Sequence, residues 1–184
     1  MTALVVIAVI VIAVVLMYNS LISKKNQVDN IFAGVDAVLK KRYNLIPNLV
    51  SSVQQYMKHE REILEKVTEL RARAMKPGIS DEQKIDLDRQ ITSMLGSIMV
   101  AVENYPELKA NENIMHLQRT LTEIEAQIAA ARRAYNQAVT DYNNAIEMIP
   151  TNILANMMGY TRKQVFEIPD AERKNVNVKE LFEQ

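Results

Sequence analysis

The N-terminal segment constrains this chain most, because it is continuously apolar and uncharged. Every residue from Ala3 to Met17 is apolar, and the first charged side chains are Lys24 and Lys25. A helix needs about 20 mostly apolar residues to cross the hydrocarbon core of a membrane, and residues 2–22 meet that need. We therefore predict a transmembrane anchor over residues 1–23.

A cleaved signal peptide and a buried core helix are the two other interpretations of this segment. A signal peptide has basic residues before its apolar block and small residues at its cleavage site. Here no basic side chain precedes the block, the bulky sequence Leu16-Met17-Tyr18-Asn19 follows it, and there is no lipobox cysteine. A core helix seldom runs this far without a charged residue. These features favour a retained anchor.

The charges after the anchor predict its orientation. Residues 24–42 contain five lysines and arginines but only two acidic residues. The positive-inside rule keeps such a basic flank in the cytoplasm. We therefore expect a single-pass protein with its N-terminus outside and its main domain in the cytoplasm. Tyr18 is expected at the membrane interface, with Lys24 and Lys25 beside the lipid headgroups.

After the anchor, two sets of residues repeat every seven positions and place one apolar stripe on a long helix. Arg42 and Glu60 are exceptions, because each is a charged residue at a stripe position. Pro47 lies inside the pattern, but the stripe keeps its register on both sides of it, so we predict a kinked helix that runs to about Met75. The apolar members are Val28, Val35, Leu49, Tyr56, Ile63 and Leu70 in one set, and Phe32, Leu39, Ile46, Val53, Val67 and Ala74 in the other.

Two further long helices are expected, joined by short connections. Ser80 is the expected N-cap of the second, with Gln83 at the capping-box position. This helix ends before Pro106, because the residue preceding a proline avoids helical angles. The third covers residues 114–149, where apolar residues recur in steps of three and four. A short helix over roughly residues 152–158 follows it.

These elements predict an all-α fold, in which the N-terminal transmembrane helix is continuous with an antiparallel bundle of three long helices plus one short C-terminal helix. Helices joined by short connections are usually antiparallel neighbours. An intermolecular coiled coil would show the same heptads, but the turns at 76–80 and 105–111 favour hairpins within one chain. The predicted units are the anchor (1–23), a cytoplasmic helical-bundle domain (24–160) and an irregular C-terminal tail (161–184), either packed on the bundle or disordered.

The composition excludes several classes of function. Without cysteine the chain has no disulfide, no cysteine-based zinc site and no thiol nucleophile. His59 and His116 are its only histidines, and the sequence at His59 lacks the second histidine of a zinc-protease motif. A formal net charge of zero argues against nucleic-acid binding. We therefore expect no catalytic, cofactor-binding or metal-binding residues, no cofactor and no nucleic-acid partner.

Arg42 and Glu60 are the candidate polar positions of the bundle. They are 18 residues apart, or about 27 Å along a straight helix, so they do not pair with each other. Because buried charges are rarely left unpaired, each needs a partner on another helix. The expected role is a structural polar contact that sets the helix register. An interaction site for a ligand or partner, or a side chain that extends to solvent, are the alternatives.

Several sequence blocks occur together in a specific combination. They are residues 36–50, followed by Tyr56 and His59-Glu60, then residues 108–113, residues 131–136, Tyr142-Asn143 and residues 149–155. Together they closely resemble the LemA (MamQ/LemA-like) family over nearly the whole chain, the anchor included. The resemblance implies a bacterial inner-membrane protein with a helical-bundle domain. It implies no established enzymatic mechanism, so no catalytic residues are transferred to this chain.

We expect the chain to be a membrane-anchored scaffold or adaptor and not an enzyme. Its expected partners are membrane lipid, through the N-terminal helix, further copies of itself in a homo-oligomer, and other proteins of unknown identity. Two alternatives stay open. One is a membrane-remodelling or membrane-organelle assembly protein of the MamQ-like kind, and the other is a ligand-binding module with a pocket between helices near Arg42 or Glu60.

Overall fold

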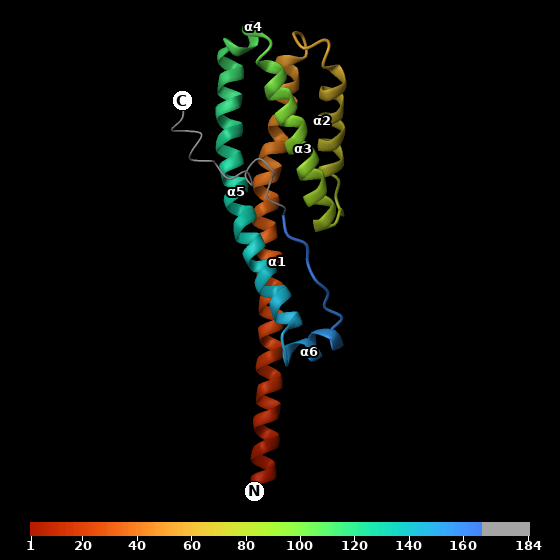
Figure 1. Cartoon of the computed structure of the whole chain (residues 1–184), viewed down its shortest axis with the longest axis vertical. Coiled ribbons are helices and arrows are strands. Elements are labelled where there is room, and N and C mark those ends of the chain that lie inside the picture. Colours follow the sequence, from red (N-terminus) through yellow and green to blue (C-terminus); the bar gives the residue numbers. More distant parts are fainter. Residues whose placement is uncertain (167–184) are drawn as a thin grey trace, which may run out of the picture.

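The structure, a computed structural model, describes residues 1–166. In these residues α1 rises from the N-terminus, α2 returns, α3 rises again and α5 runs back toward the anchor (Figure 1). This confirms the predicted all-α fold, in which an apolar N-terminal helix continues into an antiparallel bundle. The helices are α1 (Thr2–Val53), α2 (Arg61–Ala74), α3 (Asp81–Val102), α4 (Pro106–Lys109), α5 (Glu112–Glu147) and α6 (Thr151–Met157).

The predicted extent of the first bundle helix, to about Met75, is wrong. The chain leaves α1 well before that point and reverses direction over residues 54–60 (Figure 1). The apolar period continues across the turn because α1 and α2 bury their apolar faces in the same bundle. Just after α1 the buried positions shift by one, so Met57 and Leu64 are buried instead of the residues before them. A period shows which side chains are buried, and it does not show whether the chain turns between them.

α1 continues through Pro47 without interruption. Proline has no N–H to donate to the carbonyl four residues earlier, which here belongs to Tyr43. Arg71 of α2 donates its Nε–H to that carbonyl at a distance of 2.8 Å. Because α2 runs back beside α1, a side chain of the second helix replaces the hydrogen bond that proline removes from the first.

Short-range caps determine where α3 and α5 begin. Ser80 forms the predicted capping box, because the Gln83 N–H donates to Ser80 Oγ at 3.2 Å and the Ser80 N–H donates to Gln83 Oε1 at 3.0 Å. Gly78 adopts a φ of 80° in the preceding turn, a conformation that favours glycine. The Asn111 side chain accepts a hydrogen bond from the Asn113 N–H at 2.9 Å and caps α5.

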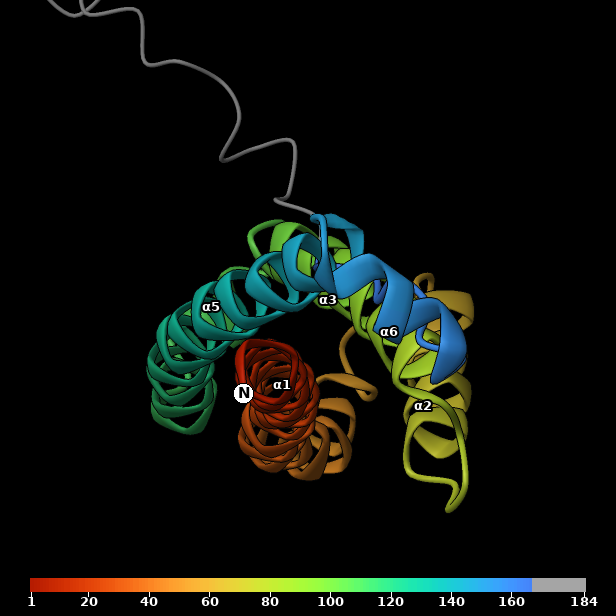
Figure 2. The ribbon, with the colours of Figure 1, turned by 90° about the horizontal axis from the view of Figure 1, so that it is seen from below.

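The bundle consists of two closely packed helix pairs, α1 with α5 and α2 with α3. Viewed from the anchor end, α5, α3 and α2 form an arc around one side of α1 (Figure 2). α3 and α5 make little direct contact with each other, although both pack against α1. A groove lies between α3 and α5 on one face of the bundle.

Residues 160–166 are extended and are held on α5 by two asparagine side chains. Asn143 Oδ1 accepts from the Lys163 N–H at 2.9 Å, and its Nδ2 donates to the Lys163 carbonyl at 3.0 Å. Asn136 pairs in the same way with Phe166, at 2.8 and 2.9 Å. Asn136 and Asn143 are seven residues apart on a helix, and their partners Lys163 and Phe166 are three residues apart in an extended segment. Both separations span about 10 Å, so each asparagine lies opposite its partner. The rest of the predicted tail lies outside the described residues, and the predicted domain boundaries stay predictions.

Candidate functional site

Arg42 lies in the bundle portion of α1 with no exposed surface. Its Nη2 forms a salt bridge with Asp88 Oδ1 of α3. Its Nη1 donates to Glu125 Oε1 of α5 at 2.5 Å and to Thr92 Oγ1 of α3 at 2.9 Å. Burial by itself would lower the pKa of the guanidinium, but the carboxylates of Asp88 and Glu125 outweigh it and raise that pKa above its ordinary value. Arg42 is therefore buried as a cation.

Asp88 is the centre of this cluster. Its carboxylate is buried and pairs with two guanidinium groups, that of Arg42 through Oδ1 and that of Arg132 of α5 through Oδ2. The Thr92 hydroxyl donates to the backbone carbonyl of Asp88 at 2.9 Å. We call Arg42, Asp88, Glu125 and Arg132 the ion network. It links α1, α3 and α5, and it joins two helices that otherwise have little contact.

A groove of about 770 Å³ lies between α3 and α5 beside the ion network. We call it the α3–α5 groove. Thr92, Glu125 and Arg132 contribute polar groups to it, so three residues that contact Arg42 or Asp88 are reachable from outside. Its other lining residues are mostly apolar or small, and include Leu95, Gly96, Met99, Leu121, Ala126 and Ala129. The groove thus combines an apolar wall with two opposite charges.

Tyr43 follows Arg42 in the chain and is also buried. Its ring centroid lies 5.9 Å from Cζ of Arg42. Burial, and then the negative charge of Asp88, raise the pKa of the Tyr43 hydroxyl far above its ordinary value of 10.0, although the charge of Arg42 acts in the opposite direction. The phenol is therefore neutral in the folded protein over the physiological pH range.

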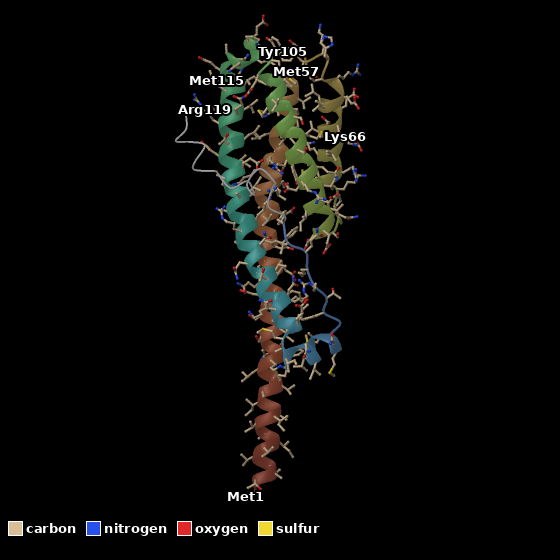
Figure 3. The ribbon with its side chains drawn as sticks, viewed as in Figure 1. Met1, Met57, Lys66, Tyr105, Met115 and Arg119 are labelled. Carbon is tan, nitrogen blue, oxygen red and sulfur yellow. The ribbon has the colours of Figure 1, made fainter. Side chains whose placement is uncertain are left out.

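Glu60 is remote from the ion network. It lies in the turn before α2, and Tyr105 donates its hydroxyl to Glu60 Oε2 at 2.8 Å. This hydrogen bond raises the pKa of the Tyr105 hydroxyl. Tyr105 and Met57 lie at the end of the bundle opposite Met1 (Figure 3). The structure therefore does not bring Glu60 and Arg42 together, and Glu60 instead links the α1–α2 turn to the segment before α4.

The residues expected at the membrane interface lie near the base of the bundle. α1 is the one helix among residues 1–166 that is long and apolar enough to cross a membrane. Tyr18 is exposed and Lys24 is partly exposed. Lys25 pairs with Asp29 at 2.9 Å, and Asp29 also binds Lys163 at 2.8 Å. Burial favours a raised pKa for Asp29, but the two lysines outweigh it and lower that pKa. The lipid contacts of these residues stay predictions.

The ion network contains residues that the sequence pattern did not single out. Asp88 precedes Ile91 by three positions, so it lies on the apolar stripe of α3 and could have been recognised as a charged outlier like Arg42. Glu125 and Arg132 flank the stripe of α5, where charged residues are ordinary, and no pattern distinguishes them. In the part of the chain that the structure describes, no group of three histidine or acidic residues is placed to hold a metal ion.

Comparison with known proteins assigns the chain to a family. The LemA family matches residues 31–179. Protein LemA of Metamycoplasma hominis is 27% identical over 163 residues, which cover 89% of this chain and 74% of that protein. Magnetosome protein MamQ 2 of Paramagnetospirillum magneticum is 25% identical, with 94% and 73% covered, and magnetosome protein MamQ of Magnetospirillum gryphiswaldense is 21% identical, with 91% and 71% covered. Because the family match spans most of the helical bundle and most of the chain, this protein belongs to the LemA family.

Proposed function

We propose that the chain is a single-pass, membrane-anchored scaffold or adaptor that self-associates at the bacterial inner membrane. The observation that carries this proposal is the continuity of α1. Its apolar side chains are exposed through Leu16, Leu21 is its first buried residue, and the same helix reaches Val53 without interruption. An unbroken helix couples the position of the bundle rigidly to that of the anchor, which is what a scaffold at a membrane requires.

The orientation belongs to the same proposal. The basic flank, which includes Lys24 and Lys25, supports a cytoplasmic bundle and an outside N-terminus by the positive-inside rule. We infer that the bundle acts by binding and not by catalysis, because a chain without cysteine and with two separated histidines has few groups for nucleophilic or metal-assisted chemistry. A cysteine-accessibility experiment in intact cells would test the orientation.

We place the self-association surface at the α3–α5 groove. α3 and α5 run alongside the bundle portion of α1 (Figure 1), so in an anchored protein this groove faces sideways. Membrane anchors confine all copies to one membrane plane and hold every bundle at the same distance from the bilayer. This favours lateral contact between the same surface on neighbouring copies. Gly96, Ala126 and Ala129 keep side chains in the groove small, and small residues allow a helix to approach closely. We therefore propose a second copy of this chain as the occupant.

A pair of glycine variants tests this surface in the full-length protein. A Cβ added to Gly96 meets no atom within 4 Å, and Gly96 is an exposed residue that lines the groove, so Gly96→Leu adds a large apolar side chain there from an open position. Gly34 of α1 is equally open and lies outside the groove, so Gly34→Leu is the matched control. We expect wild type and Gly34→Leu to be oligomeric by light scattering in mild detergent, and Gly96→Leu to dissociate. A monomeric wild type without crosslinked partners contradicts self-association, and dissociation by Gly34→Leu alone contradicts the choice of groove.

Two relatives whose names describe them as magnetosome proteins support one alternative, a role in membrane remodelling or in assembly of a membrane organelle. Reconstitution into liposomes distinguishes this alternative. A remodelling protein changes the shape of the liposomes at high protein density, whereas a scaffold or adaptor leaves them spherical. Electron microscopy of the same samples used for the mass measurement provides the readout.

The second alternative is a ligand-binding module, and one observation favours it. The Nε atoms of Arg42 and Arg132 are buried and have no hydrogen-bond partner among the described residues, and Arg132 lines the groove. Such donors suit a small anionic ligand. A thermal-shift screen of small carboxylates and phosphates against wild type and Arg132→Met tests this. A ligand that stabilises wild type but not the variant supports it, and the absence of any stabilisation contradicts it.

A further inference from the structure

α6 occupies a distinctive place in the molecule. It lies crosswise to α1 at the end of the bundle where α1 emerges alone (Figures 1 and 2). It packs against α1 and α5, with Ala155 buried in the contact. The exposed apolar part of α1 begins immediately beyond this end of the bundle, since Leu21 is the first buried residue of that helix.

The segment around α6 exposes large apolar side chains to an unusual degree. Met148 is 65% exposed, Ile149 84%, Ile153 61% and Met157 79%. Ile153 and Met157 are one helical turn apart, so they share a face, and Ala155 lies on the opposite, buried face. Elsewhere in residues 54–166 the exposed large apolar side chains are scattered singly at Tyr56, Met75, Val100 and Val165. Contiguous apolar patches on a protein surface mark interaction sites, whereas single exposed residues are ordinary.

The sequence of this segment is also free of charge. No Asp, Glu, Lys or Arg occurs from Met148 to Thr161, between Glu147 and Arg162. A segment of this kind enters the headgroup region of a bilayer without the large cost of dehydrating an ionised group. The charged residues on either side, Glu147 and Arg162, are exposed and form a salt bridge with each other.

We propose that residues 148–157 are a second membrane contact, in which α6 lies in the interfacial layer of the bilayer that α1 crosses. Because α6 is crosswise to α1, it lies along the bilayer plane when the anchor is upright (Figure 1). The exposed apolar part of α1 begins at the same end of the bundle, so both apolar surfaces border that end. Amphipathic segments at this position bury their apolar face about 5–10 Å into the boundary between headgroups and acyl chains.

The lipid surface fits this patch better than a protein partner does, because the anchor already brings the patch to the bilayer. The inference rests on the proposed membrane anchoring and adds a function to it. One helix that crosses a bilayer can rotate and tilt freely, whereas a second contact beside it restricts both motions. α6 therefore sets the direction in which the α3–α5 groove faces its neighbours.

The natural absence of cysteine makes a direct test possible. Single variants Ile153→Cys and Met157→Cys of the full-length protein are labelled with an environment-sensitive fluorophore and reconstituted into nanodiscs with brominated or ordinary lipids. Val100→Cys, exposed near the opposite end of the bundle, is the matched control, and Ile10→Cys reports on the anchor. Because an interfacial helix buries its apolar face about 5–10 Å into the headgroup and acyl boundary, we expect brominated lipid to lower the fluorescence at residues 153 and 157. We expect it to quench residue 10 as well and to leave residue 100 unaffected.

The outcomes separate this inference from the anchoring on which it rests. Quenching at residue 10 with none at residues 153 and 157 overturns the α6 contact and leaves the anchor intact. No quenching at residue 10 overturns the anchoring itself. Protection of residues 153 and 157 from aqueous iodide without quenching by brominated lipid identifies a protein occupant instead of lipid, and also overturns the inference.

Discussion

Replacing Arg42 with methionine tests whether the ion network holds the bundle together. Methionine keeps most of the length of the arginine stem but removes the charge and all the guanidinium hydrogen bonds. The variant leaves Asp88 buried with one guanidinium partner, that of Arg132, in place of two. Glu125 is partly exposed, so water compensates for much of its loss. The cost therefore falls mainly on Asp88.

Removing one partner of a buried ion pair typically costs about 3–5 kcal/mol. Because Arg132 still neutralises Asp88, we expect the lower end of that range, about 3 kcal/mol, or roughly a hundredfold change in the folded-to-unfolded ratio. Arg61→Met is the matched control, because the Arg61–Glu65 side chains are 82% and 65% exposed. Exposed pairs of this kind contribute about 0.5 kcal/mol or less.

Urea denaturation of the full-length protein in non-ionic detergent, followed by far-UV circular dichroism, measures both variants. A double-mutant cycle with Asp88→Leu separates the energy of the Arg42–Asp88 interaction from the other effects of each substitution. We expect a coupling energy of about 2 kcal/mol between residues 42 and 88. The reasoning is refuted if Arg42→Met destabilises the protein no more than Arg61→Met does, because the cost is expected from leaving the buried carboxylate of Asp88 without one of its partners.

Three further predictions concern other contacts of the bundle. Arg71→Met removes the donor to the Tyr43 carbonyl and should lower the free energy of unfolding by about 1–2 kcal/mol. The loss should be smaller in a Pro47→Ala background, where residue 47 regains its N–H. Equal losses in both backgrounds would contradict the idea that Arg71 replaces the hydrogen bond that proline removes. Asn143→Ala should release the extended segment and accelerate tryptic cleavage after Lys163, with unchanged cleavage as the contrary result. Because the pKa of Tyr43 is raised in the folded state, its contribution to stability is complete below pH 10.0 and is lost as the pH rises above it. The free energy of unfolding should therefore fall by at most about 1.4 kcal/mol per pH unit from this group, and Tyr43→Phe should flatten the dependence in an alkaline denaturation series.

Much of the secondary structure could be predicted from the sequence alone. The anchor follows from an uncharged apolar run, because the hydrocarbon core of a membrane accepts little else. The long period of α5 and the capping box at Ser80 are local signals, formed by residues within a few turns of one another. Arg42 was identifiable as a charged residue on an apolar stripe, and a charge at such a position needs a partner wherever the chain provides one.

Other features depend on contacts between residues distant in sequence. The reversal over residues 54–60 leaves the heptad stripe nearly unchanged, because two antiparallel helices in one bundle bury the same kind of face that one long helix would. Glu60 occupies a stripe position and was expected to need a partner on another helix. In the structure it lies in the turn before α2, and its carboxylate accepts a hydrogen bond from the Tyr105 hydroxyl. The hydrogen bond from Arg71 to the Tyr43 carbonyl exists only because that turn brings α2 back beside Pro47.

The sequence by itself determined that this chain is helical, that it has one apolar anchor and that a buried arginine lies in its bundle. Only the tertiary structure decided that Asp88, Glu125 and Arg132 surround that arginine and that α3 and α5 leave a groove beside it. It also decided that α6 lies crosswise at the end of the bundle from which the anchor emerges. The physical reason is that helical periodicity and capping are set by near neighbours along the chain. The pairing of charges, and the exposure of an apolar face, depend on how separate helices pack.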